Sequence, residues 1–133
     1  MDSEYRKLDQ REQDLIRKLL ENEFDGRDAF LTQIDSVLGK ETIPGEFIHL
    51  RCTAGDPGPK GPSLIAEGEC HDADGALLGV LLHCDKDGFL GVLETIRYDG
   101  NPIQRQPQAS DVNIVSTPRY WPGRLRDEGP ISN

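Results

Sequence analysis

The chain has 133 residues and a formal net charge of −9, and 35% of its residues are hydrophobic. This length suits one domain that buries its own core without the support of a metal or of disulfides. The negative charge repels phosphate backbones, so it argues against direct nucleic-acid binding and favours a basic protein partner. Solubility alone also explains an acidic composition, and this alternative stays open.

The sequence contains no candidate membrane segment or export signal. No stretch approaches the ~18 apolar residues that a membrane-spanning helix needs, and the first ten residues lack the apolar core of a signal peptide. We therefore expect a cytoplasmic protein that does not bind a membrane. The cysteines Cys52, Cys70 and Cys84 are odd in number, so we expect reduced thiols and no disulfide framework.

Two amphipathic helices are expected near the N-terminus. From Leu8 to about Asn22, apolar residues recur at helical spacing, with charged residues on the other faces. A second and shorter helical pattern runs from Phe30 to Leu38, and Gly39 follows it in the position that commonly ends a helix.

From residue 40 onward the apolar pattern becomes that of β-strands. Strands are expected at Glu46–Cys52, Ser63–Cys70, Ala76–Cys84 and Phe89–Tyr98. The Pro- and Gly-rich stretch 53–62 is expected to be a long exposed loop. Asp-Gly pairs at 74–75, 87–88 and 99–100 provide the positive φ of tight turns, so we expect a β-meander in which each pair closes one hairpin.

Together these elements predict an α+β fold, with two N-terminal helices packed on an antiparallel β-meander of four to five strands whose order follows the chain. A single α+β domain is expected over residues 1–103. Residues 104–133 are rich in Pro, Gln, Ser and Asn, and we expect an extended C-terminal segment there. Within it Val112, Ile114 and Val115 suit an edge strand, and the remainder is expected to be a tail.

Each histidine lies near a cysteine in the sequence, and both side chains are preferred zinc ligands. In the predicted meander Cys70 and Cys84 are roughly 20 Å apart at ~3.3 Å per residue, so a four-ligand site cannot form. Residues 83–94 match part of an EF-hand calcium loop, but His83 replaces the first aspartate and strands replace the flanking helices. We predict neither a metal nor a cofactor.

No catalytic motif is found. No cysteine lies in a glycine-framed nucleophile elbow, and no phosphate-binding glycine loop precedes a helix. The sequence does not single out any acidic residue, such as Glu67 or Glu94, as one that is desolvated and so suited to acid–base catalysis. We predict that the protein is not an enzyme, and a small enzyme without a recognisable motif remains a third alternative.

Three segments carry a resemblance to a known class of proteins: LIRKLL (15–20), FDGRDAFLTQID (24–35) and DADGALLGVLLHCDKDGFLGVLETIRYDGNPI (72–103). Over about residues 12–103 the chain resembles small bacterial immunity proteins, which are encoded beside polymorphic or contact-dependent growth-inhibition toxins. The resemblance implies a protein that binds and neutralises a cognate toxin. Toxins of these systems often cleave nucleic acids and carry a basic cleft, which an acidic protein can occupy.

The candidate partner-binding residues are acidic or aromatic. Two acids share a strand face, four are expected to project from turns, and the aromatic residues are typical interface anchors. The candidates are Glu67, Glu69, Asp72, Asp74, Asp85, Asp87, Tyr98 and Trp121. The alternative function is a structural or adaptor module that docks or homodimerises through a helix face or an exposed edge strand.

Overall fold

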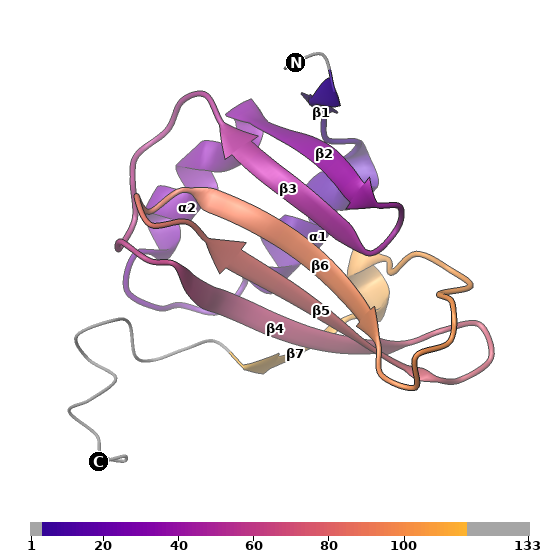
Figure 1. The fold of residues 1–133 in the computed structure, drawn as a ribbon. Coiled ribbons are helices and arrows are strands. Elements are labelled where there is room, and N and C mark those ends of the chain that lie inside the picture. The colour runs from indigo at the N-terminus through magenta and orange to yellow at the C-terminus, as the bar shows by residue number, and fades with distance from the viewer. Residues whose placement is uncertain (1–3, 117–133) are drawn as a thin grey trace.

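The computed structural model describes residues 4–116, which form two α-helices and one seven-stranded sheet (Figure 1). The helices are α1 (Gln10–Leu19) and α2 (Arg27–Gln33), and the short 3-10 turns are η2 (Ile34–Ser36) and η3 (Ala109–Asp111). The strands are β1 (Arg6–Lys7), β2 (Val37–Ile43), β3 (Phe47–Cys52), β4 (Ser63–His71), β5 (Leu77–Cys84), β6 (Leu90–Arg97) and β7 (Asn113–Ser116). The predicted α+β class is confirmed.

The sheet is antiparallel throughout, with the strand order β1-β2-β3-β6-β5-β4-β7. The expectation of four or five strands in chain order was therefore wrong. The meander β4-β5-β6 is present, but β6 pairs on its other side with β3. Because β3 occupies that edge, the Asp-Gly pair at 99–100 closes no hairpin, and the chain continues to the far edge, where β7 pairs with β4.

The second helix is shorter than its sequence pattern. α2 ends at Gln33 and, after η2, Val37 begins β2, where it pairs with Cys52. The helical spacing extends to Leu38, but a β-branched valine also suits a strand, and the pairing with β3 decides between the two. Gly39, which was expected to end the helix, lies inside β2.

The start of α1 is fixed by a capping box. The Asp9 carboxylate accepts a hydrogen bond from the Glu12 N–H, and the Glu12 carboxylate accepts one from the Asp9 N–H, both at 2.9 Å. Glu12 is 2% exposed and pairs with Arg6 at 2.8 Å. Burial alone raises the pKa of Glu12, but the Arg6 and Asp9 hydrogen bonds outweigh it and lower the pKa overall. The capping box thus satisfies the N–H groups of Asp9 and Glu12 at the start of the helix.

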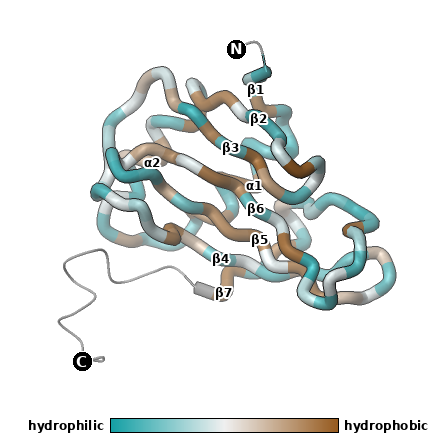
Figure 2. Tube along the Cα trace, viewed as in Figure 1, coloured by the Kyte–Doolittle hydropathy of each residue, from teal (hydrophilic) through white to brown (hydrophobic). Residues whose placement is uncertain are grey.

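Both helices lie on the same face of the sheet (Figure 1). α1 contributes Leu15, Ile16 and Leu19 to the core, each at most 1% exposed, and α2 contributes Phe30. The hydrophobic colouring of Figure 2 runs along β5, whose inward side chains complete this core. Burial of this apolar surface between helices and sheet is the main stabilising contribution.

Gln33 joins α2 to two distant segments. Its side chain is fully buried, and its amide nitrogen donates to the carbonyl oxygens of Asp56 at 2.7 Å and Gly88 at 3.0 Å. Its amide oxygen accepts a hydrogen bond from the Leu90 N–H at 2.8 Å. The 53–62 segment is irregular, as expected, but it is anchored here, and the Gly58 N–H also donates to the Gly88 oxygen at 2.8 Å.

Candidate functional site

The sheet face opposite the helices is built from alternate strand residues. On β4, Ala66 and Cys70 are buried on the helix side, so the alternate residues Glu67 and Glu69 lie on the other side. Directly paired residues of antiparallel strands share a face. This surface, called the open face below, consists of Phe47, His49, Glu67, Glu69, Leu81, His83, Val92, Glu94, Ile96 and Tyr98. Within residues 4–116, no helix lies over it (Figure 1).

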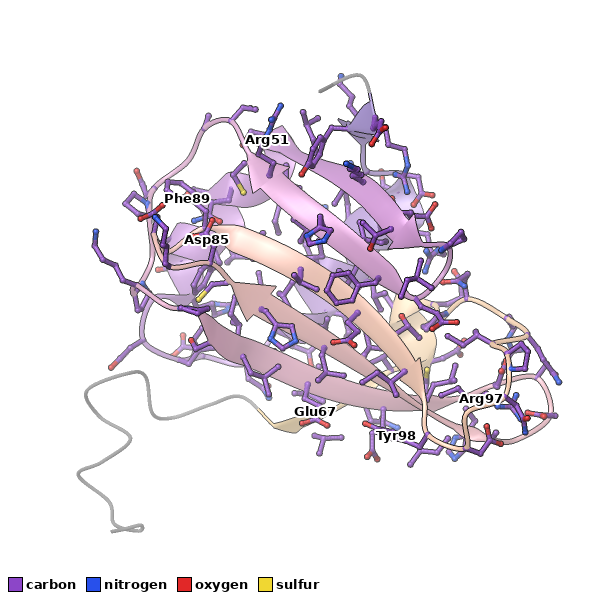
Figure 3. All side chains as sticks on the ribbon, viewed as in Figure 1. Arg51, Glu67, Asp85, Phe89, Arg97 and Tyr98 are labelled. Atoms are coloured by element: carbon purple, nitrogen blue, oxygen red, sulfur yellow. The ribbon has the colours of Figure 1, made fainter. Side chains whose placement is uncertain are left out.

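Acidic side chains gather around a tyrosine on this face. Glu67 pairs across the strands with Leu81, and Leu81 pairs with Glu94. Burial raises the pKa of the Tyr98 phenol, and the charges of Glu67, Glu69 and Glu94 raise it further. Figure 3 shows Glu67 and Tyr98 along the same margin of the sheet. We call Glu67, Glu69, Glu94 and Tyr98 the acidic patch.

The acidic patch is weakly neutralised. Among residues 4–116, Glu67 and Glu69 form no ion pair, and Glu94 has only His83, whose Nε2 lies 3.6 Å from the Glu94 Oε1. Tyr98 is 51% exposed. Its ring lies against Gly79, where any Cβ would collide with the phenol oxygen. A glycine at this position lets the tyrosine lie on the sheet surface.

A shallow hollow of about 670 Å³ adjoins the acidic patch on β3, β5 and β6. Its lining includes Phe47, His49, His83 and Val92. The rings of Phe47 and His49 pack edge to face, with their centroids 5.0 Å apart. Apolar and aromatic surface next to carboxylates suits a basic protein segment that also carries an aromatic or apolar side chain.

The side chains of the open face include positive charges toward β1 and β2. Lys40 pairs with His49 in the sheet, and therefore lies on the same face. Its ammonium group is 2.8 Å from the Glu4 carboxylate, and the Arg51 guanidinium lies 4.6 Å from the centre of the Tyr5 ring. Lys40 and Arg51 thus lie toward one edge of the open face, and the acidic patch is on the strands toward the other edge. Lys86 of the β5–β6 turn lies at the hollow and is 3.4 Å from the Asp87 carboxylate.

Asp72 and Asp74 lie elsewhere, in a cluster that we call the Arg97 clamp: Arg97, Asp72, Asp74 and Asp99. The guanidinium contacts the Asp72 carboxylate at 2.8 Å, the Asp74 carboxylate at 2.7 Å and the Asp99 carboxylate at 2.8 Å. The Arg97 side chain is only 5% exposed. Arg97 and Tyr98 are neighbours in sequence, but alternation along the strand sends their side chains to opposite faces.

The expectation that Asp72 projects accessibly from a turn was wrong. Asp72 is 3% exposed, and its carboxylate accepts hydrogen bonds from the N–H groups of Ala73, Gln104 and Arg105, each at 2.8 Å. Burial raises the pKa of Asp72, but these hydrogen bonds and Arg97 outweigh it and hold the pKa at about 2. The Asp72 carboxylate therefore holds the backbone of residues 104 and 105 against the β4–β5 turn and is not accessible to a partner.

The other two turn acids, Asp85 and Asp87, belong to the β5–β6 turn. Figure 3 shows Asp85 and Phe89 at the end of the sheet opposite to Arg97. Asp85 accepts hydrogen bonds from the N–H groups of Asp87 at 2.9 Å and Phe89 at 3.0 Å, so it stabilises the β5–β6 turn. Asp87 is exposed and lies 3.4 Å from the Lys86 ammonium. Trp121 lies outside the described residues.

Glu94 belongs to the acidic patch but is not among the partner-binding residues predicted from the sequence. A signal for it is present, because Glu94, Ile96 and Tyr98 alternate along one strand. Leu90, which the same alternation assigns to that face, is fully buried instead. The reason is a register irregularity between His83 and Cys84, opposite the start of β6.

Within residues 4–116, no three His, Cys, Asp or Glu side chains are placed to hold a metal ion. Burial raises the pKa of the Cys52 thiol to about 11 and also raises that of Cys70, so both are protonated at neutral pH and weakly nucleophilic. In the same range, no helix has both the length and the apolar character needed to cross a membrane.

Comparison with known proteins identifies a family. A family model described as a domain of unknown function, DUF6984, matches residues 5–107. The chain belongs to the DUF6984 family. No curated protein and no solved structure matches the chain.

The DUF6984 match contains both helices and six of the strands, β1 to β6. It therefore includes the whole open face, the Arg97 clamp and the backbone of residues 104 and 105 that Asp72 holds. β7 follows the matched region and adds an edge strand to the DUF6984 sheet beside β4.

Proposed function

We propose that this DUF6984 protein is an immunity protein that binds a basic toxin domain through its open face. The observation that carries the proposal is the acidic patch, in which Glu67 and Glu69 lack ion-pair partners among residues 4–116 while Tyr98 is half exposed. A partner with lysine or arginine around an aromatic or apolar side chain would match both the patch and the hollow.

The charge pattern supports a simple mode of inhibition. Carboxylates and phosphates are both negatively charged oxygen ligands, so a protein that presents Glu67, Glu69 and Glu94 together can occupy a cleft built for a nucleic-acid backbone. The overall net charge of −9 steers the basic partner toward the protein and raises the association rate. The hollow then supplies the apolar contact that slows dissociation.

The predicted site residues have different roles in this mode of binding. Glu67, Glu69 and Tyr98 belong to the binding surface, and Glu94 joins them. Asp72 and Asp74 act through the Arg97 clamp and stabilise the fold that supports this surface.

The test compares the wild-type protein with two charge-matched variants. The first replaces Glu67, Glu69 and Glu94 by Lys. The second replaces Asp14, Glu21 and Asp35, exposed residues on the helix side, by Lys, which gives the same change in net charge. Each protein is used to capture partners from lysate of the source organism, and the captured protein is then expressed in cells with and without each variant.

We expect the wild-type and helix-side variants to capture one basic protein that arrests growth when expressed alone, and to restore growth when co-expressed with it. The open-face variant is expected to do neither. A non-toxic partner that depends on the open face would instead identify an adaptor module. Equal capture and equal rescue by both variants would contradict the proposed binding surface.

A further inference from the structure

The described chain ends next to the acidic patch. β7 is an edge strand that lies beside β4 (Figure 1). Its last residue, Ser116, pairs directly with Glu67 of β4. From Ser116 the direct cross-strand pairs continue through Glu67, Leu81, Glu94 and Phe47. At ~4.8 Å between neighbouring strands, the four spacings from β7 to β3 place Phe47 about 19 Å from Ser116 across the open face. Residues 117–133 therefore continue from one margin of the open face.

The sequence that follows has the opposite charge to the patch. Residues 119–126 read RYWPGRLR, with Arg119, Arg124 and Arg126 and no acid. The same eight residues include Tyr120 and Trp121. This is a basic and aromatic segment in a chain whose net charge is −9.

The segment is long enough to reach both parts of the surface. At ~3.3 Å per residue, residues 117–121 span up to about 17 Å. The hollow beside the patch includes Val92 of β6 and Phe47 of β3, three and four strands from β7 in the sheet order. Trp121 can therefore reach the hollow while the arginines remain within reach of Glu67, Glu69 and Glu94.

We propose that residues 119–126 bind across the open face of their own chain, with the arginines paired to the acidic patch and Trp121 in the hollow. The arginines supply the cations that Glu67 and Glu69 lack among residues 4–116. The aromatic rings cover the apolar and aromatic lining of the hollow. The segment is then an internal competitor for any basic partner of this face.

Trp121 makes the proposal directly measurable, because it is the only tryptophan in the chain. Tryptophan emission of the full-length protein is recorded at low salt, together with its quenching by acrylamide, and the chain unfolded in urea gives the reference for an exposed indole. We expect the folded chain to emit at shorter wavelength than this reference and to be quenched several-fold less. Emission and quenching equal to the reference would overturn the proposal.

Four variants then locate the binding surface. Lysines at Glu67, Glu69 and Glu94 are expected to shift the emission to longer wavelength and to restore quenching, whereas lysines at Asp14, Glu21 and Asp35 leave both unchanged. Glutamates at the three arginines of residues 119–126 are expected to reproduce the shift. Combining these glutamates with the open-face lysines restores the wild-type emission. If the emission is unchanged both in the open-face lysine variant and in the variant with glutamates at the three arginines, Trp121 does not lie in the hollow and the proposal is contradicted.

Dilution and sedimentation distinguish binding within one chain from binding to a second copy. We expect the emission to be independent of concentration in a monomer, and a blue shift seen only together with dimer mass would overturn the intramolecular assignment. None of these measurements needs a partner, so they stand or fall separately from the proposed immunity function. If that function holds, glutamates at Arg119, Arg124 and Arg126 should also tighten partner binding several-fold.

Discussion

Two clusters of carboxylates lie on the same sheet, and they differ in burial and in ion-pair partners. In the Arg97 clamp, the carboxylates of Asp72, Asp74 and Asp99 surround one guanidinium, and Asp72 is 3% exposed. In the acidic patch, Glu67 and Glu69 have no ion-pair partner among residues 4–116. A carboxylate on this sheet is therefore available to a partner only where no neighbouring strand or turn supplies a cation for it. The clamp stabilises the fold, and the patch presents carboxylates to a basic segment, either residues 119–126 or a partner.

The largest effect is expected from removing the cation of the clamp. Arg97→Leu leaves three carboxylates close together, with Asp72 buried among them, so repulsion and desolvation lose their compensation. We expect the largest fall in the urea unfolding midpoint among all the variants discussed, and an intermediate fall for Arg97→Lys, which keeps the charge but not the planar set of donors. A wild-type midpoint in Arg97→Leu would show that the clamp is not structural.

The next effect concerns acid. The pKa of Asp72 is about 2 in the folded protein, below the ordinary aspartate value of 3.8, so its ionised form favours folding. This contribution is fully present above the unfolded pKa and is lost as the pH falls from about 4 through about 2. We expect Asp72→Asn to be less stable than wild type at pH 7, and the difference in unfolding free energy to shrink toward pH 2.

Glu67→Gln provides the contrast for this acid experiment. It removes a carboxylate that has no ion pair among residues 4–116, so the difference from wild type should be small at every pH in the series. Urea unfolding at stepped pH measures both variants. If the two pH profiles coincided, the proposed distinction between the clamp and the patch would be incorrect.

A third effect separates binding from stability. Lysines at Glu67, Glu69 and Glu94 change surface residues that face no core, so the free energy of unfolding should change by about 1 kcal/mol or less. Affinity for a basic partner should fall at least about tenfold, because attraction becomes repulsion. Chemical unfolding and binding titration of the same samples measure the two quantities. A large loss of stability would assign these glutamates to the fold.

The smallest effect is expected at Gly79. Gly79→Ala places a Cβ where the Tyr98 phenol oxygen lies, and the far end of the tyrosine can turn away at little cost in stability. Once the ring leaves the sheet and the nearby carboxylates, the raised pKa of Tyr98 should fall toward its ordinary value of 10. Spectroscopic titrations of the wild-type, Gly79→Ala and Tyr98→Phe proteins measure this shift, because the Tyr98→Phe protein identifies the contribution of Tyr98. An unchanged titration of Tyr98 would mean that its ring does not depend on Gly79.

Much of the local structure is predictable from sequence. Alternation along β4 places Glu67 and Glu69 on one face, and the Asp-Gly pairs at 74–75 and 87–88 mark two turns of the meander. These signals involve residues close together in the chain, where the period of side chains and the backbone freedom of glycine decide the outcome.

Contacts between distant segments are not predictable in this way. The pairing of β3 with β6 connects Phe47 to Glu94, and no local pattern favours it over pairing with β4. The hydrogen bonds from Gln104 and Arg105 to Asp72 likewise depend on the tertiary path of the chain. Sequence alone therefore groups Asp72 with Glu67 as a surface acid, although only the glutamate lies on the open face.

Whether the open face binds the partner is decided by the dissociation constant of the captured basic protein for three proteins, measured by calorimetric titration at low and high salt. These are the wild type, the open-face variant with lysines at Glu67, Glu69 and Glu94, and the helix-side variant with lysines at Asp14, Glu21 and Asp35. We predict near wild-type affinity for the helix-side variant and a loss of at least about tenfold for the open-face variant, with the difference narrowing as salt rises. Equal affinities for the two variants would contradict the account.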